Sequence, residues 1–252
     1  MISYQFPDFC KPLQRVMHDT PKPQGTEVLV RVTRSGVCHS DMHIWDGYFE
    51  LGGGKRFYVK ERGCVPPFTL GHEPLGIVED FGSSVSRIDK KIKRGQKRIV
   101  FPWIGCGRCA ICKSGQDNYC VSGSRFLGIN RPGAYASHVL VPHPKYLVDS
   151  SGIDDAFAAA LGIGALRKGG RYVICGLFGG ELVHPLPPIA QRAIGIAGSY
   201  VGNLQELKEV VALAKRKKLK PAPVSVRPAD QVTAILEDLK AGKILGRVVL
   251  AF

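Results

Sequence analysis

The stretch GHEPLGIVEDFGSSV, residues 71–85, joins two side chains that bind metals to a short apolar segment. His72 and Glu73 place an imidazole beside a carboxylate, and residues 74–80 predict a strand that ends in a glycine- and serine-containing turn. Further short strands are predicted at 26–37, 97–101 and 136–141. Residues 1–150 therefore predict an all-β barrel or sandwich with long functional loops. One of these loops, Tyr48–Pro67, is long enough to carry specificity.

The pattern changes after about residue 150. Helices are predicted at 154–161, at 204–217 behind the capping residue Asn203, and at 229–241 before Gly242. Strands are predicted at 171–177, 193–200 and 246–252. Alternating strands and helices indicate an α/β unit, but these segments are too few for a complete nucleotide-binding sheet.

Composition excludes several classes of protein. Hydrophobic residues make up 44% and charged residues 22% of 252 residues, which is typical of a folded globular chain. No apolar run approaches the ~20 residues of a membrane span. The N-terminus, Met1–Phe6, lacks the basic region followed by an apolar one that marks a secretion signal, so a cytoplasmic protein is expected. The net charge of +14 is concentrated in Arg87–Arg98 and Lys215–Lys220. Neither segment contains interleaved aromatic residues, so a solvated basic face is expected rather than a nucleic-acid partner.

Four of the eight cysteines lie within fifteen residues, with the spacing C-x2-C-x2-C-x7-C. They are Cys106, Cys109, Cys112 and Cys120. Clustered cysteines in a chain without a secretion signal are more often metal ligands than disulfides. Four thiolates satisfy a closed, tetrahedral structural zinc site. Iron–sulfur ligation and unrelated buried thiols are the alternatives.

A second, dispersed set of ligands consists of Cys38, His72 and Glu73. Either segment alone is compatible with polar groups that are satisfied beneath a loop. Together they offer the thiolate, imidazole and carboxylate of a catalytic zinc site that keeps one position open for substrate.

These motifs resemble those of the medium-chain zinc-dependent alcohol dehydrogenases. Residues 71–85 fit the zinc-binding pattern G-H-E-x2-G-x5-G-x2-V of that family, and GVCHSDMH (36–43) is similar to its first catalytic-ligand segment. PWIGCGRCAICKSGQDNYC (102–120) resembles the structural-zinc lobe, and GAYASHVLVP (133–142) the strand that follows it. The match covers nearly all of residues 1–160.

The resemblance implies an α+β protein. Residues 1–160 would form a GroES-like β-barrel catalytic domain with a structural-zinc lobe at about 102–122. Residues 161–220 would be a truncated remnant of a Rossmann α/β domain, and residues 221–252 would return to the catalytic domain.

Site roles follow by position within the matched motifs. The resemblance implies that Cys38 and His72 bind catalytic zinc and that Glu73 lies beside it as a second-shell partner or alternate ligand. Ser40 and His43 would relay the alcohol proton to solvent, and His39 would face the cofactor pyrophosphate. For Trp45, Phe49 and Trp103, the substrate-pocket wall and ordinary core packing are equally compatible with the sequence.

The cofactor-binding segment of the family is missing from the sequence. Its G-x-G-x-x-G turn and the acidic residue after it are not found, and only Gly162 and Gly164 give a G-x-G. The resemblance implies a deletion of roughly 90 residues, about three strand–helix units, near Leu161–Leu166. The third zinc-ligand cysteine is absent too. We therefore expect weakened catalytic zinc, weak NAD(P) binding and exposed strand edges that pair with another copy of the chain.

Three functions remain open at this point. The first is the NAD(P)-dependent conversion of a small alcohol, primary, secondary or aromatic, to an aldehyde or ketone, impaired by the shortening. The second is a catalytically inactive zinc-binding module that lacks its cofactor domain. The third, a zinc-ribbon-like nucleic-acid binder, has only the basic charge in its favour.

Overall fold

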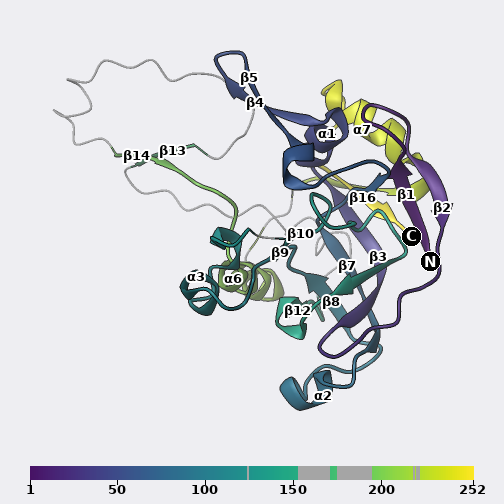
Figure 1. Cartoon of the computed structure of the whole chain (residues 1–252), viewed down its shortest axis with the longest axis vertical. Helices are drawn as coiled ribbons and strands as arrows, with labels where there is room; N and C mark the ends of the chain where they lie inside the picture. Colours follow the sequence, from purple (N-terminus) through teal and green to yellow (C-terminus); the bar gives the residue numbers. More distant parts are fainter. Residues whose placement is uncertain (124, 153–170, 175–194, 218, 220–221) are drawn as a thin grey trace.

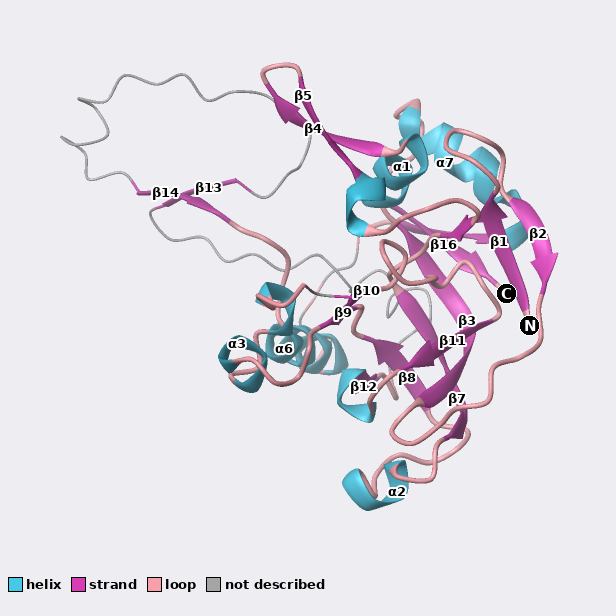
Figure 2. Ribbon diagram, viewed as in Figure 1, coloured by secondary structure: helices cyan, strands magenta, loops and turns pink. Residues whose placement is uncertain are grey.

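The computed structural model describes residues 1–123, 125–152, 171–174, 195–217, 219 and 222–252. The predicted helix at 154–161, the fragment from Gly162 to Gly164, the deletion point near 161–166 and Cys175 lie outside the described residues. The described part is dominated by strands, with helices packed around them (Figures 1 and 2).

The largest sheet has the strand order β12-β8-β7-β3-β16-β15, and β11 also pairs with β3. Its strands are β3 (Val28–Val37), β7 (Pro74–Phe81), β8 (Lys97–Val100), β11 (His138–Val141), β12 (Leu147–Asp149), β15 (Val224–Pro228) and β16 (Arg247–Ala251). The smaller strands outside it include β1 (Ile2–Phe6), β2 (Gln14–Met17), β6 (Phe68–Thr69), β9 (Trp103–Ile104) and β10 (Arg125–Phe126). The strands predicted at 26–37, 74–80, 97–101 and 136–141 are therefore confirmed to within two residues at each end.

β3 organises this sheet because both of its edges are paired. β7 runs antiparallel along one edge from Val28 to Ser35. On the other edge β11 pairs with the first half of β3 and β16 with the second half. The C-terminal strand thus lies beside the part of β3 that leads into Cys38, which brings the end of the chain next to the candidate metal ligands.

Helices lie around the sheet, and α6 (Leu204–Lys215) and α7 (Val232–Lys240) bury apolar faces. The other helices of the described residues are α1 (His39–Asp46), α2 (Val85–Ile88) and α3 (Ala110–Lys113), with 3₁₀ turns η1 (Val59–Arg62), η2 (Asp117–Tyr119), η3 (Pro144–Tyr146) and η4 (Ala229–Gln231). Asn203 caps α6 by accepting a hydrogen bond from Glu206 N at 2.9 Å, as predicted. In α7, Val232, Ile235, Leu236 and Leu239 recur at helical spacing and are all buried.

Two sequence expectations were wrong in detail. Tyr48–Pro67 is not a long irregular loop, because β4 (Tyr48–Gly52) and β5 (Lys55–Tyr58) form a hairpin that η1 follows. Glycines 52–54 have positive φ values, which makes the tight turn of this hairpin possible. After Cys38 the sequence indicates only a ligand motif, yet this segment forms the helix α1.

β13 (Arg171–Ile174) and β14 (Gly195–Gly198) form a separate two-stranded parallel sheet. They lie away from the main sheet in Figure 1. Parallel pairing is expected of a piece of α/β structure, because parallel strands need a crossover connection between them.

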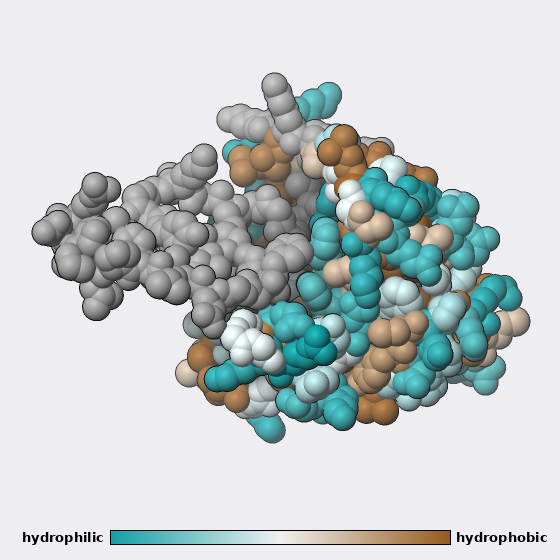
Figure 3. Space-filling view, turned by 90° about the horizontal axis from the view of Figure 1, so that it is seen from above, coloured by the Kyte–Doolittle hydropathy of each residue, from teal (hydrophilic) through white to brown (hydrophobic). Residues whose placement is uncertain are grey.

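The described part of the face drawn in Figure 3 is mixed in hydropathy. The coloured part of the face in Figure 3 shows separate apolar patches among hydrophilic residues. Among the helices of the described residues, none has the length and apolar character needed to cross a lipid bilayer.

Candidate metal centre and active site

Cys38 lies where β3 ends and α1 begins. Its extended backbone, with φ −119° and ψ 153°, places it at the helix N-terminus. The preceding turn of β3 is tied to the other ligands, because Gly36 N donates to Glu73 O at 3.1 Å. A side chain at Gly36 is excluded, since its Cβ would lie 2.0 Å from Glu73 Oε2. Close packing of two chain segments thus brings distant ligands together.

Asp41, on the first turn of α1, orients the imidazole of His72. The Asp41 carboxylate is fully buried and accepts hydrogen bonds from His72 Nδ1 at 3.0 Å, Tyr135 Oη at 2.9 Å, Cys38 N at 3.0 Å and Gly71 N at 3.2 Å. Although burial opposes it, the contact with His72 lowers the pKa of Asp41. With Nδ1 engaged, the remaining ring nitrogen, Nε2, is free to bind a metal ion.

Glu73 is buried beside this pair and forms an ion pair with Arg247 at the start of β16. Its Oε2 contacts Arg247 Nη2, whereas Oε1 is buried with no hydrogen-bond partner. Although burial lowers it, the charge of Glu73 raises the pKa of Arg247 above its ordinary value. One atom each of Cys38, His72 and Glu73 lie within 4.8 Å of one another. A buried carboxylate oxygen without a partner, next to a thiol and an imidazole, fits a zinc ion.

The other three site residues predicted from the sequence lie on α1. Ser40 lines a cavity together with His72. The His43 ring contacts that of Phe49, with centroids 5.1 Å apart. Burial lowers the pKa of His43, which favours the neutral ring near pH 7. His39 is exposed, and burial of part of its ring and the positive charge of Arg247 lower its pKa.

The cavity next to His72 has a volume of about 370 Å³ and mostly apolar walls. Phe49, Phe57, Trp103, Phe126, Leu127 and Ile129 contribute to them. Trp45 is not part of its lining and is buried instead in the core that includes α7, with its ring nitrogen donating to Lys11 O at 2.7 Å. The cavity can therefore bring an apolar alcohol to the candidate zinc ligands.

The four clustered cysteines meet in a small lobe around α3. Cys109 caps α3 by accepting from Cys112 N at 3.4 Å, and Cys106 Sγ accepts from Cys109 N at 3.4 Å. Hydrogen bonds from the backbone lower the pKa of Cys106 to about 5. The four sulfur atoms lie within 4.8 Å of one another.

This geometry fits a tetrahedral zinc ion. Zn–S bonds of about 2.3 Å place the sulfurs of a tetrahedron about 3.8 Å apart. Cys106 Sγ and Cys112 Sγ are 3.9 Å apart. The seven cysteines in the described part of the chain are all free thiols.

The lobe is anchored to the rest of the fold by Asp117. This buried carboxylate accepts from Lys145 Nζ at 2.9 Å and from Tyr146 Oη at 2.9 Å. At Gly105 a side chain is excluded, because its Cβ would lie 2.4 Å from Cys112 Sγ. The lobe is therefore held by contacts that the cysteine spacing does not reveal.

Sequence reasoning missed Asp41, Tyr135 and Arg247 as parts of the site. Asp41 stands three residues after Cys38, a spacing that permits the observed helix-capping hydrogen bond. Tyr135 and Arg247 carry no local signal, since their positions depend on contacts between segments far apart in the chain.

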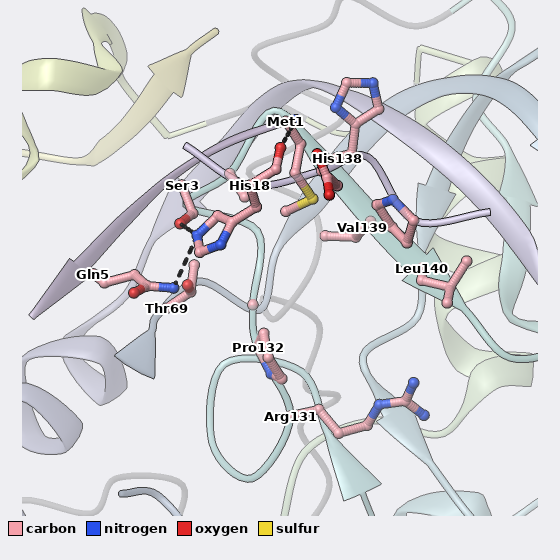
Figure 4. Close-up of a pocket in the computed structure, with 14 residues that line it drawn as sticks. Met1, Ser3, Gln5, His18, Thr69, Arg131, Pro132, His138, Val139 and Leu140 are labelled. Atoms are coloured by element: carbon pink, nitrogen blue, oxygen red, sulfur yellow. Dashed lines mark hydrogen bonds between the residues drawn. The ribbon is translucent and has the colours of Figure 1, made fainter. Parts of the chain in front are cut away.

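A second cavity, of about 360 Å³, lies elsewhere and involves the N-terminal strands (Figure 4). There the His18 ring is hydrogen-bonded to Ser3 Oγ at 2.8 Å. None of the candidate metal ligands lines this cavity.

Comparison with known proteins places the chain among its relatives. Residues 24–151 match the model of the alcohol dehydrogenase GroES-like domain. NAD-dependent alcohol dehydrogenases of Sulfurisphaera tokodaii and Saccharolobus solfataricus are each 28% identical over 344 residues, covering 95% of this chain and 96% of the relative. Because these alignments are longer than the 252-residue chain, the relatives contain internal residues without a counterpart here.

A solved structure supports the fold. The thermostable alcohol dehydrogenase of Pyrobaculum aerophilum superimposes with a TM-score of 0.83 at 22% identity, covering 100% of this chain and 99% of the other. The α+β class with a GroES-like domain, as expected from the sequence, is confirmed. With the family model matching half of its length, the chain belongs to the medium-chain, zinc-type alcohol dehydrogenase family.

Proposed function

We propose that the chain interconverts an alcohol and its aldehyde or ketone by hydride transfer with NAD(P), with low turnover in this shortened form. The observation that carries the proposal is the convergence of Cys38, His72 and Glu73 beside an apolar cavity that Ser40 also lines. A mixed set of sulfur, nitrogen and oxygen ligands is typical of catalytic rather than structural zinc.

The chain's own residues can bind the metal and move the proton. Cys38 and His72 would hold the zinc ion, with Glu73 as the third ligand or a close neighbour. When bound, zinc lowers the pKa of an alcohol hydroxyl. Ser40 would accept the hydroxyl proton and pass its own to His43, three residues further along the same helix. The lowered pKa of His43 leaves its ring neutral and able to accept this proton.

Cofactor binding is supported only in part by the described residues. His39 and Arg247 are close enough for the charge of Arg247 to lower the pKa of His39. The charge of Arg247 and a ring N–H of the neutral His39 imidazole would suit the pyrophosphate of a dinucleotide. The glycine-rich turn that normally holds the pyrophosphate is missing from the sequence, so we expect weak NAD(P) affinity.

We propose that the chain has the three parts that the resemblance implies. Residues 1–160 form the catalytic domain, with the structural-zinc lobe of Cys106, Cys109, Cys112 and Cys120 at about 102–122. Residues 161–220 are the Rossmann remnant, and residues 221–252 return to the catalytic domain. β16 pairs with β3 and β15 pairs with β16, which supports the last assignment. We also propose a cytoplasmic homo-oligomer that acts on a small molecule and binds no nucleic acid.

The second candidate is a zinc-binding module without turnover, and the internal residues missing relative to the relatives favour it. Titration of the purified, zinc-loaded chain with NADH, followed by nicotinamide fluorescence, separates the two functions. Saturable micromolar binding together with alcohol-dependent reduction of NAD(P) is expected of the enzyme. No binding up to millimolar NADH would leave the inactive module.

A further inference from the structure

The apolar cavity beside His72 adjoins a second, more polar one. The outer cavity has a volume of about 600 Å³. Arg62, Phe126 and Tyr200 line both cavities. The walls of the outer cavity also include Glu61, Asn118 and Asn130. Consider a molecule whose hydroxyl lies at the candidate zinc ligands and whose apolar body fills the inner cavity. Its far end would therefore extend past Arg62.

Arg62 is a cation held at this junction. It is the last residue of η1, directly after the β4–β5 hairpin. Its guanidinium lies over the ring of Phe57, 4.9 Å from the centroid, and Phe57 is itself a wall of the inner cavity. A cation over an aromatic face is fixed in place while its N–H groups remain available to a ligand.

The neighbouring charges leave Arg62 unneutralised. Glu50, the acidic residue that lines the inner cavity, forms an ion pair with Arg56 at 2.9 Å. Among the ion pairs between described residues, none involves Arg62 or Glu61. Arg62 is thus the cation that the two cavities share, and it has no acidic partner within the described structure.

We propose that Arg62 is a specificity residue that binds a carboxylate at the far end of the substrate, so that the site takes apolar alcohols with a distal carboxylate. The planar guanidinium can form two parallel hydrogen bonds with a carboxylate. A single guanidinium beside the negative charge of Glu61 matches a singly charged carboxylate better than a doubly charged phosphate. This inference rests on the proposed function, since it assumes that the hydroxyl end lies at the zinc ligands.

Binding, measured without turnover, tests the inference. The probes are para-(hydroxymethyl)benzoate and the longer para-(hydroxymethyl)cinnamate, each paired with its neutral carboxamide. Quenching of the fluorescence of Trp103, which lines the inner cavity, reports binding to the zinc-loaded chain. We expect at least one carboxylate to bind roughly fivefold or more tightly than its carboxamide, as for a partly exposed charge pair. This preference should shrink as salt is added.

Three variants identify the residue responsible. Arg62→Gln should abolish the preference, whereas Arg62→Lys should keep part of it. Arg56→Gln is the matched control, because Arg56 lies in the hairpin that precedes η1 and is paired with Glu50, and it should keep the preference. Equal affinity for carboxylate and carboxamide in both pairs would overturn the inference while the proposed function stands. Failure of every probe to bind would also overturn the inference, and the NADH titration would then decide the proposed function separately.

Discussion

At the candidate catalytic zinc site, the carboxylate of Asp41 joins one ligand to the surrounding backbone. It accepts hydrogen bonds from the His72 ring and from Cys38 N, so one buried group orients the imidazole and the residue that carries the thiol. A partner of this kind fixes the ring orientation of a metal-binding histidine and raises its basicity.

Replacing this group tests its role. Asp41→Asn should lower zinc affinity at the Cys38–His72 site about 10- to 100-fold, because the amide holds the ring less firmly and carries no charge. Competition with a chromophoric chelator measures the affinity. Asp46→Asn, on the same helix but paired with Lys240 at 2.7 Å rather than with a candidate ligand, should leave zinc affinity unchanged. Equal zinc affinity in the Asp41→Asn and wild-type chains would contradict this role.

Arg247 compensates the buried charge of Glu73. Arg247→Met should lower the free energy of unfolding of the zinc-free chain by about 2 kcal/mol, less than for a fully buried pair because a quarter of the Arg247 side chain is exposed. Urea unfolding followed by circular dichroism measures the loss. The double variant Glu73→Gln/Arg247→Met should recover part of it, since no unpaired charge then remains. A double variant less stable than Arg247→Met would count against this explanation.

At the scale of elements, the cysteine lobe depends on metal more than on an apolar core. α3 spans only Ala110–Lys113, and the lobe sulfurs accept hydrogen bonds from backbone N–H groups. So short a helix is not stable by itself, and thiolate–zinc bonds would supply the missing free energy. Contacts of Asp117 with Lys145 and Tyr146 then hold the lobe against the sheet.

Removing one of the four sulfurs should therefore open the lobe. Cys112→Ser is expected to reduce the bound zinc by one ion per chain and to make residues 102–122 sensitive to protease. Metal analysis by atomic absorption and limited proteolysis with mass spectrometry measure the two effects. Cys10→Ser is the control, because Cys10 is exposed and lies outside both clusters. Unchanged zinc content in the Cys112→Ser chain would refute a structural zinc site of four thiolates.

At the scale of the whole molecule, the two parallel strands β13 and β14 contrast with the large main sheet. In the main sheet β16 pairs with the second half of β3, which ties the C-terminal strand to this sheet. β13 and β14, in contrast, pair only with each other among the described strands. A two-stranded sheet is marginally stable and leaves backbone groups open to pairing with another chain.

Self-association is the expected consequence. Sedimentation velocity at increasing protein concentration should show a shift from monomer to dimer or larger species. Because apolar and backbone contacts drive this association, added salt should not dissolve it, whereas association through the basic surface would weaken. A monodisperse monomer at high concentration would rule out the expected pairing.

The sequence predicted the fold and the candidate site to different extents. Strands with clear apolar patterns, such as β3 and β7, and the capped helix α6 were found because their signals are local. The β4–β5 hairpin and α1 were missed, since both lie in segments read for their loop character or their ligands. The spacing of the clustered cysteines was enough to predict their site. The environment of His72 could not be predicted, because it depends on contacts between four separate segments of the chain.

The sequence by itself determined which side chains are present: two sets of zinc-type ligands, the Ser40 and His43 expected to relay a proton, and no glycine-rich phosphate turn. Only the tertiary structure decided that Asp41 orients His72, that Arg247 pairs with Glu73 and that Arg62 joins two cavities. The physical reason is that ligand type and short spacing are properties of the covalent chain. Burial, charge compensation and cavity shape arise only when strands distant in sequence, such as β3 and β16, pack side by side.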